Sequence, residues 1–341
     1  MGDLSPGANL GTNYVVASAP FRISFAGGGT DLPDFYEREG GAVFSCAINQ
    51  HVYVTVKRLS PFFEDNYRLN YSQTENVNRI EDIENSIIRA CLTLLPVPPP
   101  LYVGVIADVP QSSGLGSSSS FAVTLLSALH VLRGERVSPA QLAEEAVKVE
   151  IDILRQPIGK QDQYIAAWGG LNYLSFEANG RVNVEAQSLP NDSIKHLFDN
   201  LLMFWTGISR DAGKVLESQN KNTDNNIEVL RRMKMQAQQL RDMTLTGLDI
   251  EAFGAVLAEG WDLKRTLSND ITSTEIDRLY AIGRESGAYG GKLCGAGGGG
   301  FLLFVAPPEK HETIRRNLSH MRELRVQHEP VGARVILPNW A

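Results

Sequence analysis

The chain has 341 residues, of which 43% are hydrophobic and 21% are charged, and its 39 acidic and 32 basic residues give a formal net charge of -7. This length exceeds what one hydrophobic core usually organises, so two domains are expected. The negative charge gives no overall field that would attract nucleic acid or an anionic membrane surface, so any site for an anionic ligand must be built locally.

The cysteines and the N-terminus indicate a compartment. Cys46, Cys91 and Cys294 have neither C-x-x-C spacing nor an even count, which favours a reducing environment. The opening residues MGDLSPGANLGTN lack a basic region followed by an apolar one, so no signal peptide is predicted. The longest apolar run, within residues 121–132, is shorter than the ~20 residues that span a bilayer. We therefore expect a cytoplasmic protein without a membrane partner.

The first 190 residues alternate strands and helices. Strands are predicted at residues 14–25 (interrupted by Pro20), 42–48, 51–57, 67–70, 101–109, 170–176 and 181–186. Helices are predicted at residues 80–95, 121–132 and 139–154, the last with Ser138 as N-cap and Pro139 in its first turn. The pair Asn179-Gly180 indicates a hairpin that closes this first domain, residues 1–190.

Helices dominate from residue 191 onward. They are predicted at residues 225–244, 250–267, 274–286 and 309–321, and strands at residues 201–205, 288–293, 301–305 and near Val326 and Val335. This content favours a small antiparallel sheet backed by helices. We therefore predict a second domain over residues 191–341.

Residues 110–120 (PQSSGLGSSSS) join the strand 101–109 to the helix 121–132. At a helix N-terminus the first backbone N–H groups lack intrahelical partners and the dipole is positive, so a phosphate can bind there. Gly114 and Gly116 let the backbone come close, and four consecutive serines add hydroxyl donors. A serine run that only caps the helix is the simpler alternative. No lysine follows the second glycine, which excludes a Walker A loop.

A second glycine cluster, KLCGAGGGGF at residues 292–301, contains G-x-G-x-x-G at Gly295, Gly297 and Gly300. It leads directly into an apolar strand late in the chain, whereas a dinucleotide fingerprint follows the first strand of a unit and opens a helix. The glycines favour close approach of the backbone to a ligand, and a flexible hairpin is the alternative.

Three loops together, RISFAGGGTD at 22–31, PQSSGLGSSSS at 110–120 and KLCGAGGGG at 292–300, resemble the ordered motifs of the GHMP kinases, a family of small-molecule kinases. The resemblance implies an α+β fold with a ribosomal-S5-like first domain and a ferredoxin-like second domain, and ATP and Mg²⁺ as cofactors. Within the family, AP-x-RISFAGGGTD and GKQDQY at 159–164 look like the bacterial kinases of D-glycero-D-manno-heptose 7-phosphate.

The resemblance also implies catalytic roles. Asp162 matches the aspartate that accepts the proton of the attacking hydroxyl, and Arg22 matches a nearby cation that keeps it ionised and neutralises the transferred phosphoryl group. Ser118 and Glu150 match the Mg²⁺ ligands. A solvated helix face is the alternative for Glu150, and a surface position on a strand for Arg22. The ATP cradle comprises Pro110, Ser113, Gly114, Leu115, Gly116, Ser117, Ser118 and Ser119.

The expected substrate-binding residues are Gly28, Gly29, Thr30, Asp31, Lys160, Arg210, Gly295, Gly297 and Gly298. Many GHMP kinases have Glu-His where this chain has Gly28 and Gly29, and the missing side chains leave room for a seven-carbon sugar. Asp31 as a helix N-cap is the alternative to a sugar contact. Arg210 and Lys160 are the candidates for holding a substrate phosphate. Their alternatives are a contact with Asp211 and a cation that tunes Asp162.

The sequence therefore predicts an ATP-dependent kinase that phosphorylates the anomeric hydroxyl of heptose 7-phosphate to the 1,7-bisphosphate, for nucleotide-activated heptose and surface glycans. A kinase of an unphosphorylated sugar, such as fucose or galactose, and a catalytically silent sugar sensor remain the alternatives.

Overall fold

The computed structural model describes residues 12–208, 213, 215, 217 and 223–338, which fold around two sheets. The larger sheet has the order β12-β1-β2-β5-β3-β4, and β6 pairs with both β2 and β7. Its strands are β1 (Tyr14–Ala26), β2 (Gly41–Arg58), β3 (Tyr67–Asn70), β4 (Thr74–Val77), β5 (Leu101–Ala107), β6 (Leu171–Phe176), β7 (Val182–Ala186) and β12 (Arg334–Pro338). The smaller sheet has the order β11-β8-β10-β9, formed by β8 (Leu201–Trp205), β9 (Gly290–Leu293), β10 (Phe301–Val305) and β11 (Arg322–Leu324).

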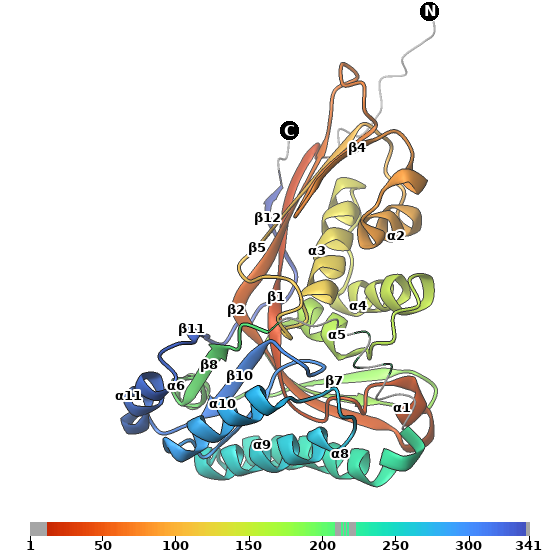
Figure 1. The fold of residues 1–341 in the computed structure, drawn as a ribbon. Helices are drawn as coiled ribbons and strands as arrows, with labels where there is room; N and C mark the ends of the chain where they lie inside the picture. Colours follow the sequence, from red (N-terminus) through yellow and green to blue (C-terminus); the bar gives the residue numbers. More distant parts are fainter. Residues whose placement is uncertain (1–11, 209–212, 214, 216, 218–222, 339–341) are drawn as a thin grey trace, which may run out of the picture.

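Helices cover one face of the upper part of the large sheet and the underside of the molecule (Figure 1). Those on or near the large sheet are α1 (Pro33–Glu39), η1 (Ile80–Asp82), α2 (Ser86–Leu94), α3 (Ser117–Leu132), α4 (Pro139–Val147), η2 (Lys148–Ile153) and α5 (Gln161–Trp168). The remaining ones are α6 (Asn191–Asp199), α8 (Thr223–Thr246), α9 (Ile250–Arg265), α10 (Thr274–Glu285) and α11 (Pro308–Asn317). Helix α3 packs on both β1 and β2, and α9 packs on β9. None of the described helices is long and apolar enough to cross a membrane.

Both long strands run through the points at which the sequence predicted breaks. Pro20 does not interrupt β1, because the register with β2 shifts between Pro20 and Phe21 and the strand continues. A bulge of this kind absorbs a residue that cannot donate to the ladder. The carbonyl of Pro20 accepts a hydrogen bond of 2.8 Å from the hydroxyl of Ser120 in α3. Strand β2 merges the two predicted strands, and its two halves pair with β6 and with β5.

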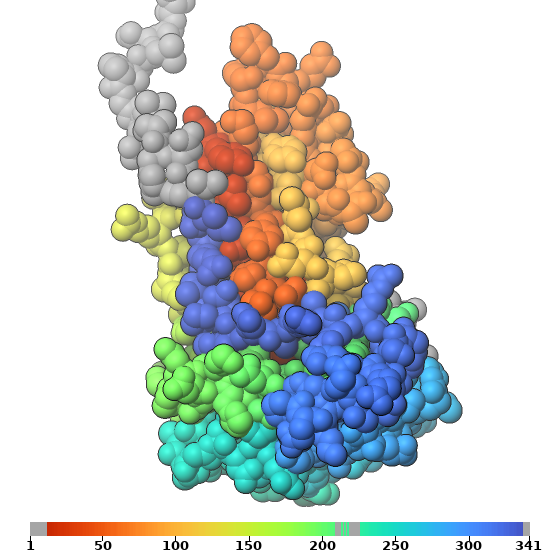
Figure 2. All heavy atoms as spheres, turned by 90° about the vertical axis from the view of Figure 1, so that its left-hand side faces the viewer, coloured from red at the N-terminus to blue at the C-terminus, as the bar shows by residue number. Residues whose placement is uncertain are grey.

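The C-terminal strand corrects the sequence prediction. The sequence assigned a strand near Val335 to the sheet of the second domain, but β12 pairs antiparallel with β1, with Ala17 opposite Val335. Figure 2 shows this segment, in blue, running up the molecule beside β1 in red. Without β12, β1 would be an edge strand with unpaired backbone groups, which is the reason for the return of the chain. The division at residue 190 remains a prediction, but residues 334–338 lie in the first sheet.

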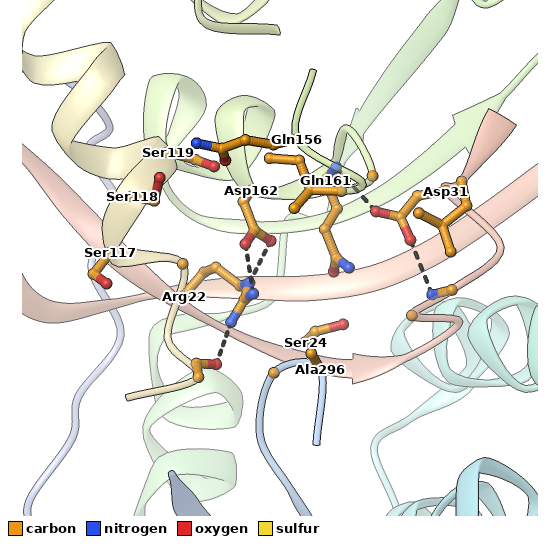
Figure 3. Close-up of a pocket in the computed structure, with 18 of the residues that line it drawn as sticks. Arg22, Ser24, Asp31, Ser117, Ser118, Ser119, Gln156, Gln161, Asp162 and Ala296 are labelled. Atoms are coloured by element: carbon orange, nitrogen blue, oxygen red, sulfur yellow. Dashed lines mark hydrogen bonds and ion pairs between the residues drawn. The ribbon is translucent and has the colours of Figure 1, made fainter. Parts of the chain in front are cut away.

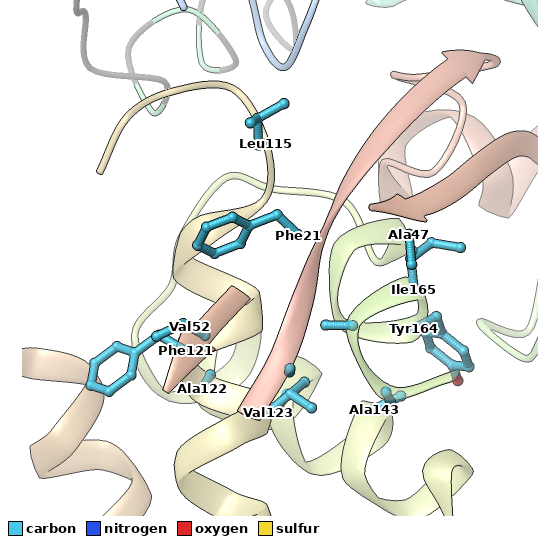
Figure 4. Close-up of a cluster of buried hydrophobic side chains, with 14 of the residues drawn as sticks. Phe21, Ala47, Val52, Leu115, Phe121, Ala122, Val123, Ala143, Tyr164 and Ile165 are labelled. Atoms are coloured by element: carbon cyan, nitrogen blue, oxygen red, sulfur yellow. The ribbon is translucent and has the colours of Figure 1, made fainter. Parts of the chain in front are cut away.

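The core of the first sheet also anchors the loop 110–120. Phe21 of β1 and Leu115 of the loop are fully buried, and Phe121 of α3 is 7% exposed (Figure 4). The amide of Arg22 donates to the carbonyl of Leu115 at 3.0 Å, so β1 and the loop are also joined through the backbone. Truncating a buried side chain of this size typically costs about 2–5 kcal/mol. The buried side chain of Leu115 therefore fixes the loop 110–120 to the core of the first sheet.

Several helices differ from the prediction in extent. The helix expected at residues 139–154 is α4 followed by the π-helical turn η2, and the one expected at 80–95 is η1 followed by α2. Helices α5 and α6 were not predicted, because each is short and surrounded by loop residues. The α+β class with two sheets and helices agrees with the prediction.

Candidate active site

A cavity of about 430 Å³ lies where the loop 110–120, the end of β1, the start of α5 and the second glycine cluster meet (Figure 3). Its lining comes from segments that are far apart in the sequence. The lining residues are Arg22, Ser24, Gly28, Gly29, Asp31, Leu32, Ser112, Gly114, Gly116, Ser117, Ser118, Ser119, Gln156, Pro157, Ile158, Gly159, Gln161, Asp162, Gly213, Lys264, Lys292, Gly295 and Ala296. All three motif loops of the sequence analysis therefore contribute to one cavity.

The start of α3 forms the wall that suits a phosphate. Gly116 precedes the helix with a left-handed backbone, φ 76°, and no side chain caps the helix. The first amides of α3 and the hydroxyls of Ser117 and Ser118 thus face the cavity without a capping group between them. The alternative in which the serines merely cap the helix is not what the structure has.

The two glycine loops pack directly against each other. A Cβ added to Gly114 would lie 2.5 Å from the carbonyl oxygen of Cys294, and one added to Gly295 would lie 2.5 Å from Cα of Gly114. Neither position can hold a side chain without moving the backbone of the other loop. Glycine at these positions brings the second domain against the phosphate wall of the first.

Arg22 and Asp162 form a two-pronged ion pair in the middle of the cavity (Figure 3). Nε of Arg22 donates to Oδ1 of Asp162, and Nη2 donates to Oδ2, each at 2.6 Å. Nη1 donates to the carbonyl of Gly114 at 2.7 Å. Burial acts to lower the pKa of Arg22, but attraction to Asp162 outweighs it and the pKa is raised. The guanidinium is therefore charged, and it fixes the direction of the carboxylate.

Gly116 is packed against this ion pair. A Cβ there would lie 3.2 Å from Oδ2 of Asp162 and 3.3 Å from Cγ of Arg22. The sequence analysis required glycine here for close approach of the backbone to phosphate. The structure adds that a side chain would press on the Arg22–Asp162 pair and would be strained by the positive φ.

Glu150 is fully buried beside the start of α3, and it does not lie on a solvated helix face. It sits in the π-helical turn η2, a feature that is frequent at functional sites. The hydroxyl of Ser118 donates to Oε1 of Glu150, and Nε2 of Gln163 donates to Oε2 at 2.7 Å. Burial raises the pKa of Glu150, although hydrogen bonds from the serines and Gln163 oppose this effect.

The oxygens around Glu150 fit Mg²⁺. A buried carboxylate that no described cation contacts, next to a serine hydroxyl, offers the hard oxygen ligands that this ion prefers. No group of three or more His, Cys, Asp or Glu side chains within the described ranges is placed to hold a metal. Ser118 and Glu150 would therefore hold the ion together with phosphate oxygens and water, which is the usual arrangement for Mg²⁺.

Asp31 joins the glycine loop at residues 27–29 to the start of α5. Its Oδ1 accepts a hydrogen bond from the amide of Gly29 at 2.9 Å, and its Oδ2 accepts one from the amide of Gln161 at 3.3 Å. It does not cap α1, whose N-cap is Leu32. Burial and the nearby charge of Asp162 raise the pKa of Asp31. A Cβ at Gly159 would lie 2.0 Å from Oδ2 of Asp31, so only glycine fits at that position.

Four predicted substrate residues do not line the cavity. The hydroxyl of Thr30 is fully buried and donates to the carbonyls of Gly27 and Ala42, both at 2.8 Å, so it holds the turn. Nζ of Lys160 donates to the carbonyl of Gly180 at 2.6 Å and lies over the ring of Tyr36. It therefore contacts the hairpin β6–β7 and not Asp162.

Gly297 and Gly298 pack on the backbone of Ile271 and do not line the cavity. A Cβ at Gly297 would lie 2.9 Å from Cα of Ile271, and the amide of Gly298 donates to the Ile271 carbonyl at 2.8 Å. Their neighbour Gly295 does line the cavity. Arg210 lies outside the described residues.

Three residues of the predicted ATP cradle also have other surroundings. Leu115 is a core residue, Pro110 is exposed at the outside of the loop, and the hydroxyl of Ser113 is buried. None of the three lines the cavity. The remaining cradle residues are Gly114, Gly116, Ser117, Ser118 and Ser119, and all five do.

Several lining residues were not predicted from the sequence: Ser24, Ser112, Gln156, Gln161, Lys264 and Lys292. A signal for Lys264 was present, because it continues the apolar face Phe253, Leu257 and Trp261 of α9 at helical spacing. A lysine on a buried face requires a reason. Ser112 has a positive φ of 58°, which the sequence did not indicate.

Comparison with known proteins decides the family. The model of the GHMP kinases N terminal domain matches residues 84–170, and the model of the GHMP kinases C terminal domain matches residues 241–323. The chain belongs to the GHMP kinase family. The resemblance on which the sequence analysis relied is thereby confirmed.

Individual GHMP kinases agree with this assignment. The chain is 28% identical over 309 residues to D-glycero-alpha-D-manno-heptose 7-phosphate kinase of Campylobacter jejuni, covering 87% of this chain and 91% of that protein. It is 27% identical over 239 residues to galactokinase of Pyrococcus furiosus, covering 62% and 65%. The crystal structure of a D-glycero-D-manno-heptose 1-phosphate kinase from Bacteroides thetaiotaomicron shares the fold, with a TM-score of 0.79 and 24% identity over 95% of this chain and 99% of that one. The chain is an ATP-dependent sugar kinase of the GHMP family.

Proposed function

We propose that this sugar kinase transfers the γ-phosphoryl group of ATP to the anomeric hydroxyl of D-glycero-D-manno-heptose 7-phosphate and forms the 1,7-bisphosphate. The observation that carries the proposal is the cavity that contains the Arg22–Asp162 pair. Gly28 and Gly29, which have no side chains, line the part of it that we assign to the acceptor sugar. The similarity to the Campylobacter jejuni kinase over most of both chains supports the choice of sugar.

The geometry suggests how the residues act. The acceptor hydroxyl donates its hydrogen bond to Asp162, whose carboxylate is oriented by Arg22 and takes the proton as the oxygen attacks phosphorus. The new O–P bond forms as the bond from the γ-phosphorus to the bridging oxygen of ADP breaks, and ADP leaves with that electron pair. Arg22, which bonds both Asp162 and the carbonyl of Gly114 in the cradle, neutralises the charge on the transferred group.

The phosphates of ATP bind at the start of α3. Amides there and the hydroxyl of Ser117 hold the phosphate oxygens. When bound, Mg²⁺ supplies positive charge to the phosphates, and Ser118 and Glu150 are the residues that hold it. Gln163 orients Glu150 through its hydrogen bond.

The setting follows from the chemistry. The reaction consumes ATP, and the three cysteines Cys46, Cys91 and Cys294 are buried and unpaired. Both facts favour the cytoplasm. The bisphosphate product suits a route to nucleotide-activated heptose for surface glycans.

A panel of sugars tests the proposal. ATP consumption by the purified protein is measured with heptose 7-phosphate, free heptose, fucose, galactose and mannose, each at the same concentration. The expected result is that heptose 7-phosphate gives the highest kcat/KM, with phosphate added at C1 as seen by NMR. A higher kcat/KM for any unphosphorylated sugar would contradict the proposal.

A further inference from the structure

The second domain contributes two lysines to the cavity that the proposed reaction does not use. Lys264, near the C-terminal end of α9, is 6% exposed, and Lys292 in β9 is 7% exposed; both line the cavity. Nζ of Lys292 donates to the carbonyls of Ser24 at 2.7 Å and Phe25 at 3.2 Å, and Nζ of Lys264 donates to the carbonyl of Gly295. An ammonium group has three donors, so both lysines have donors left for a ligand.

Neither lysine has a carboxylate partner among the described residues, and this is costly. Burial, together with repulsion from the other lysine and from Arg22, lowers the pKa of Lys264 to about 7. Burial likewise lowers the pKa of Lys292 to about 8. A buried cation normally has an anion beside it, because removing a charge from water without a partner is unfavourable. Two buried amines with unused donors on one cavity wall fit an anionic ligand, which would keep both of them protonated.

Ser24 provides an independent observation on the same wall. Its hydroxyl is buried and has no hydrogen-bond partner within the described chain, although it lines the cavity. A buried hydroxyl without a partner is uncommon and indicates a missing ligand or water. The hydroxyl lies 3.5 Å from the position that a Cβ of Gly28 would take, which is the acceptor side of the cavity.

We infer that Lys264, Lys292 and Ser24 bind the phosphate group that the acceptor sugar already carries. This inference rests on the proposed function, because it requires a phosphorylated acceptor. A phosphate dianion offers three oxygens, which can accept from both ammonium groups and from the hydroxyl. The pair takes the role for which the sequence suggested Lys160 and Arg210.

The nucleotide is the other possible source of a phosphate. Its phosphates already have the amides and hydroxyls at the start of α3. Lys292, in contrast, donates to the carbonyls of Ser24 and Phe25 in β1, and the hydroxyl of the same Ser24 lies against Gly28. We therefore assign the lysines to the acceptor, and the experiment separates the two sources.

The test compares binding of heptose 7-phosphate and of free heptose to Lys264→Met and Lys292→Met. Methionine approximately keeps the length of the side chain and removes the charge. We expect each variant to weaken binding of the phosphorylated sugar by roughly 10- to 100-fold, the effect of losing one charge-assisted hydrogen bond. The loss for free heptose should be at least about tenfold smaller. The matched control is Lys195→Met, because Lys195 is 72% exposed on α6.

A proton count provides a second readout that a purely structural lysine would not change. Lys264 lies near Lys292, Arg22, Cys294 and Asp31 and has a pKa of about 7. Above pH 7 it is largely neutral, and an arriving dianion raises its pKa. Binding of the sugar phosphate should therefore take up protons at pH 8, whereas at pH 6 Lys264 is already charged and the phosphate itself should release part of its second proton. Calorimetry in buffers of different ionisation enthalpy measures this uptake, and Lys264→Met should reduce it.

The outcomes separate this inference from the proposed function. Equal losses for both sugars, or a loss of ATP affinity in the lysine variants comparable to the loss for the sugar phosphate, would overturn the lysine assignment and leave the sugar-phosphate kinase in place. A wild-type protein that phosphorylates free heptose and ignores heptose 7-phosphate would overturn the proposed function itself. Melting temperatures of the variants identify a folding defect, and binding at a temperature well below the melting point still decides between the outcomes.

Discussion

The two carboxylates that face the cavity are held by different forces. Asp162 receives two N–H···O bonds from the guanidinium of Arg22, so its charge is paired and its direction is fixed. Asp31 receives only backbone amides, from Gly29 and Gln161, and burial raises its pKa. The first arrangement suits a carboxylate that accepts a proton, and the second holds the loop that we assign to the acceptor sugar. The hydrogen-bond partners of each aspartate therefore decide whether it suits proton transfer or holds a loop in place.

Replacing the carboxylate of the ion pair should have the largest effect. Asp162→Asn keeps the size of the side chain but removes the proton acceptor and the charge that Arg22 binds. We expect turnover to fall by roughly 10²–10⁴-fold with nucleotide affinity nearly unchanged, as measured by steady-state kinetics and calorimetry. Asp152→Asn, on an exposed position of η2, is the control. Normal turnover in Asp162→Asn would remove this residue from the mechanism.

The second largest effect is expected at the proposed Mg²⁺ site beside the ion pair. Glu150→Gln removes a negative charge but keeps the shape, and the hydroxyl of Ser118 loses its charged partner. We expect the Mg²⁺ concentration for half-maximal rate to rise by roughly 10- to 100-fold. A titration of rate against Mg²⁺ measures the shift, with the exposed Glu309→Gln as control. An unchanged titration would mean that Glu150 serves only the packing of η2.

A single added methyl group should disrupt the hydrogen bonds by which backbone amides hold Asp31. In Gly159→Ala the new Cβ would lie 2.0 Å from Oδ2 of Asp31, so the carboxylate must move away from the amide of Gln161. We expect KM for the sugar to rise by about tenfold while KM for ATP stays within about twofold, because the proposed nucleotide site is at the start of α3 and not at Asp31. If both values rise together, the two sides are not independent.

The smallest effect is expected for a lysine that is close to Asp162 in sequence but bonds a different part of the structure. Lys160 is two residues from Asp162 in sequence, but its Nζ is bonded to the carbonyl of Gly180 in the β6–β7 hairpin. Lys160→Met should change kcat/KM for heptose 7-phosphate by less than about threefold, the scale of one exposed or half-buried hydrogen bond. A loss as large as that for Lys264→Met would return Lys160 to the substrate phosphate.

The local pattern of the sequence was sufficient for the start of α3 and for five of the eight cradle residues, and the resemblance to the GHMP kinases supplied the family and the ion pair. The glycines and serines of residues 110–120 specify a turn and a helix start by their own backbone preferences, and the position of Asp162 relative to that loop follows from the motif. The turn and the helix start depend on neighbours within a few residues, whereas Arg22 and Asp162 are 140 residues apart and their pairing was implied only by the resemblance.

The direction of a long side chain was not determined in this way. Whether Lys160 or Lys264 reaches the cavity depends on how α5 and α9 are oriented against β1 and on which carbonyls are within reach, and both follow from contacts between distant segments. The same holds for the pairing of β12 with β1, which closes a sheet edge far away in the sequence. The sequence by itself determined which hydrogen-bonding and charged groups the loops offer. The tertiary structure decided which lysines and which carboxylate line the cavity and which strand pairs with β1. The reason is that packing between distant segments, and not local backbone preference, sets those distances.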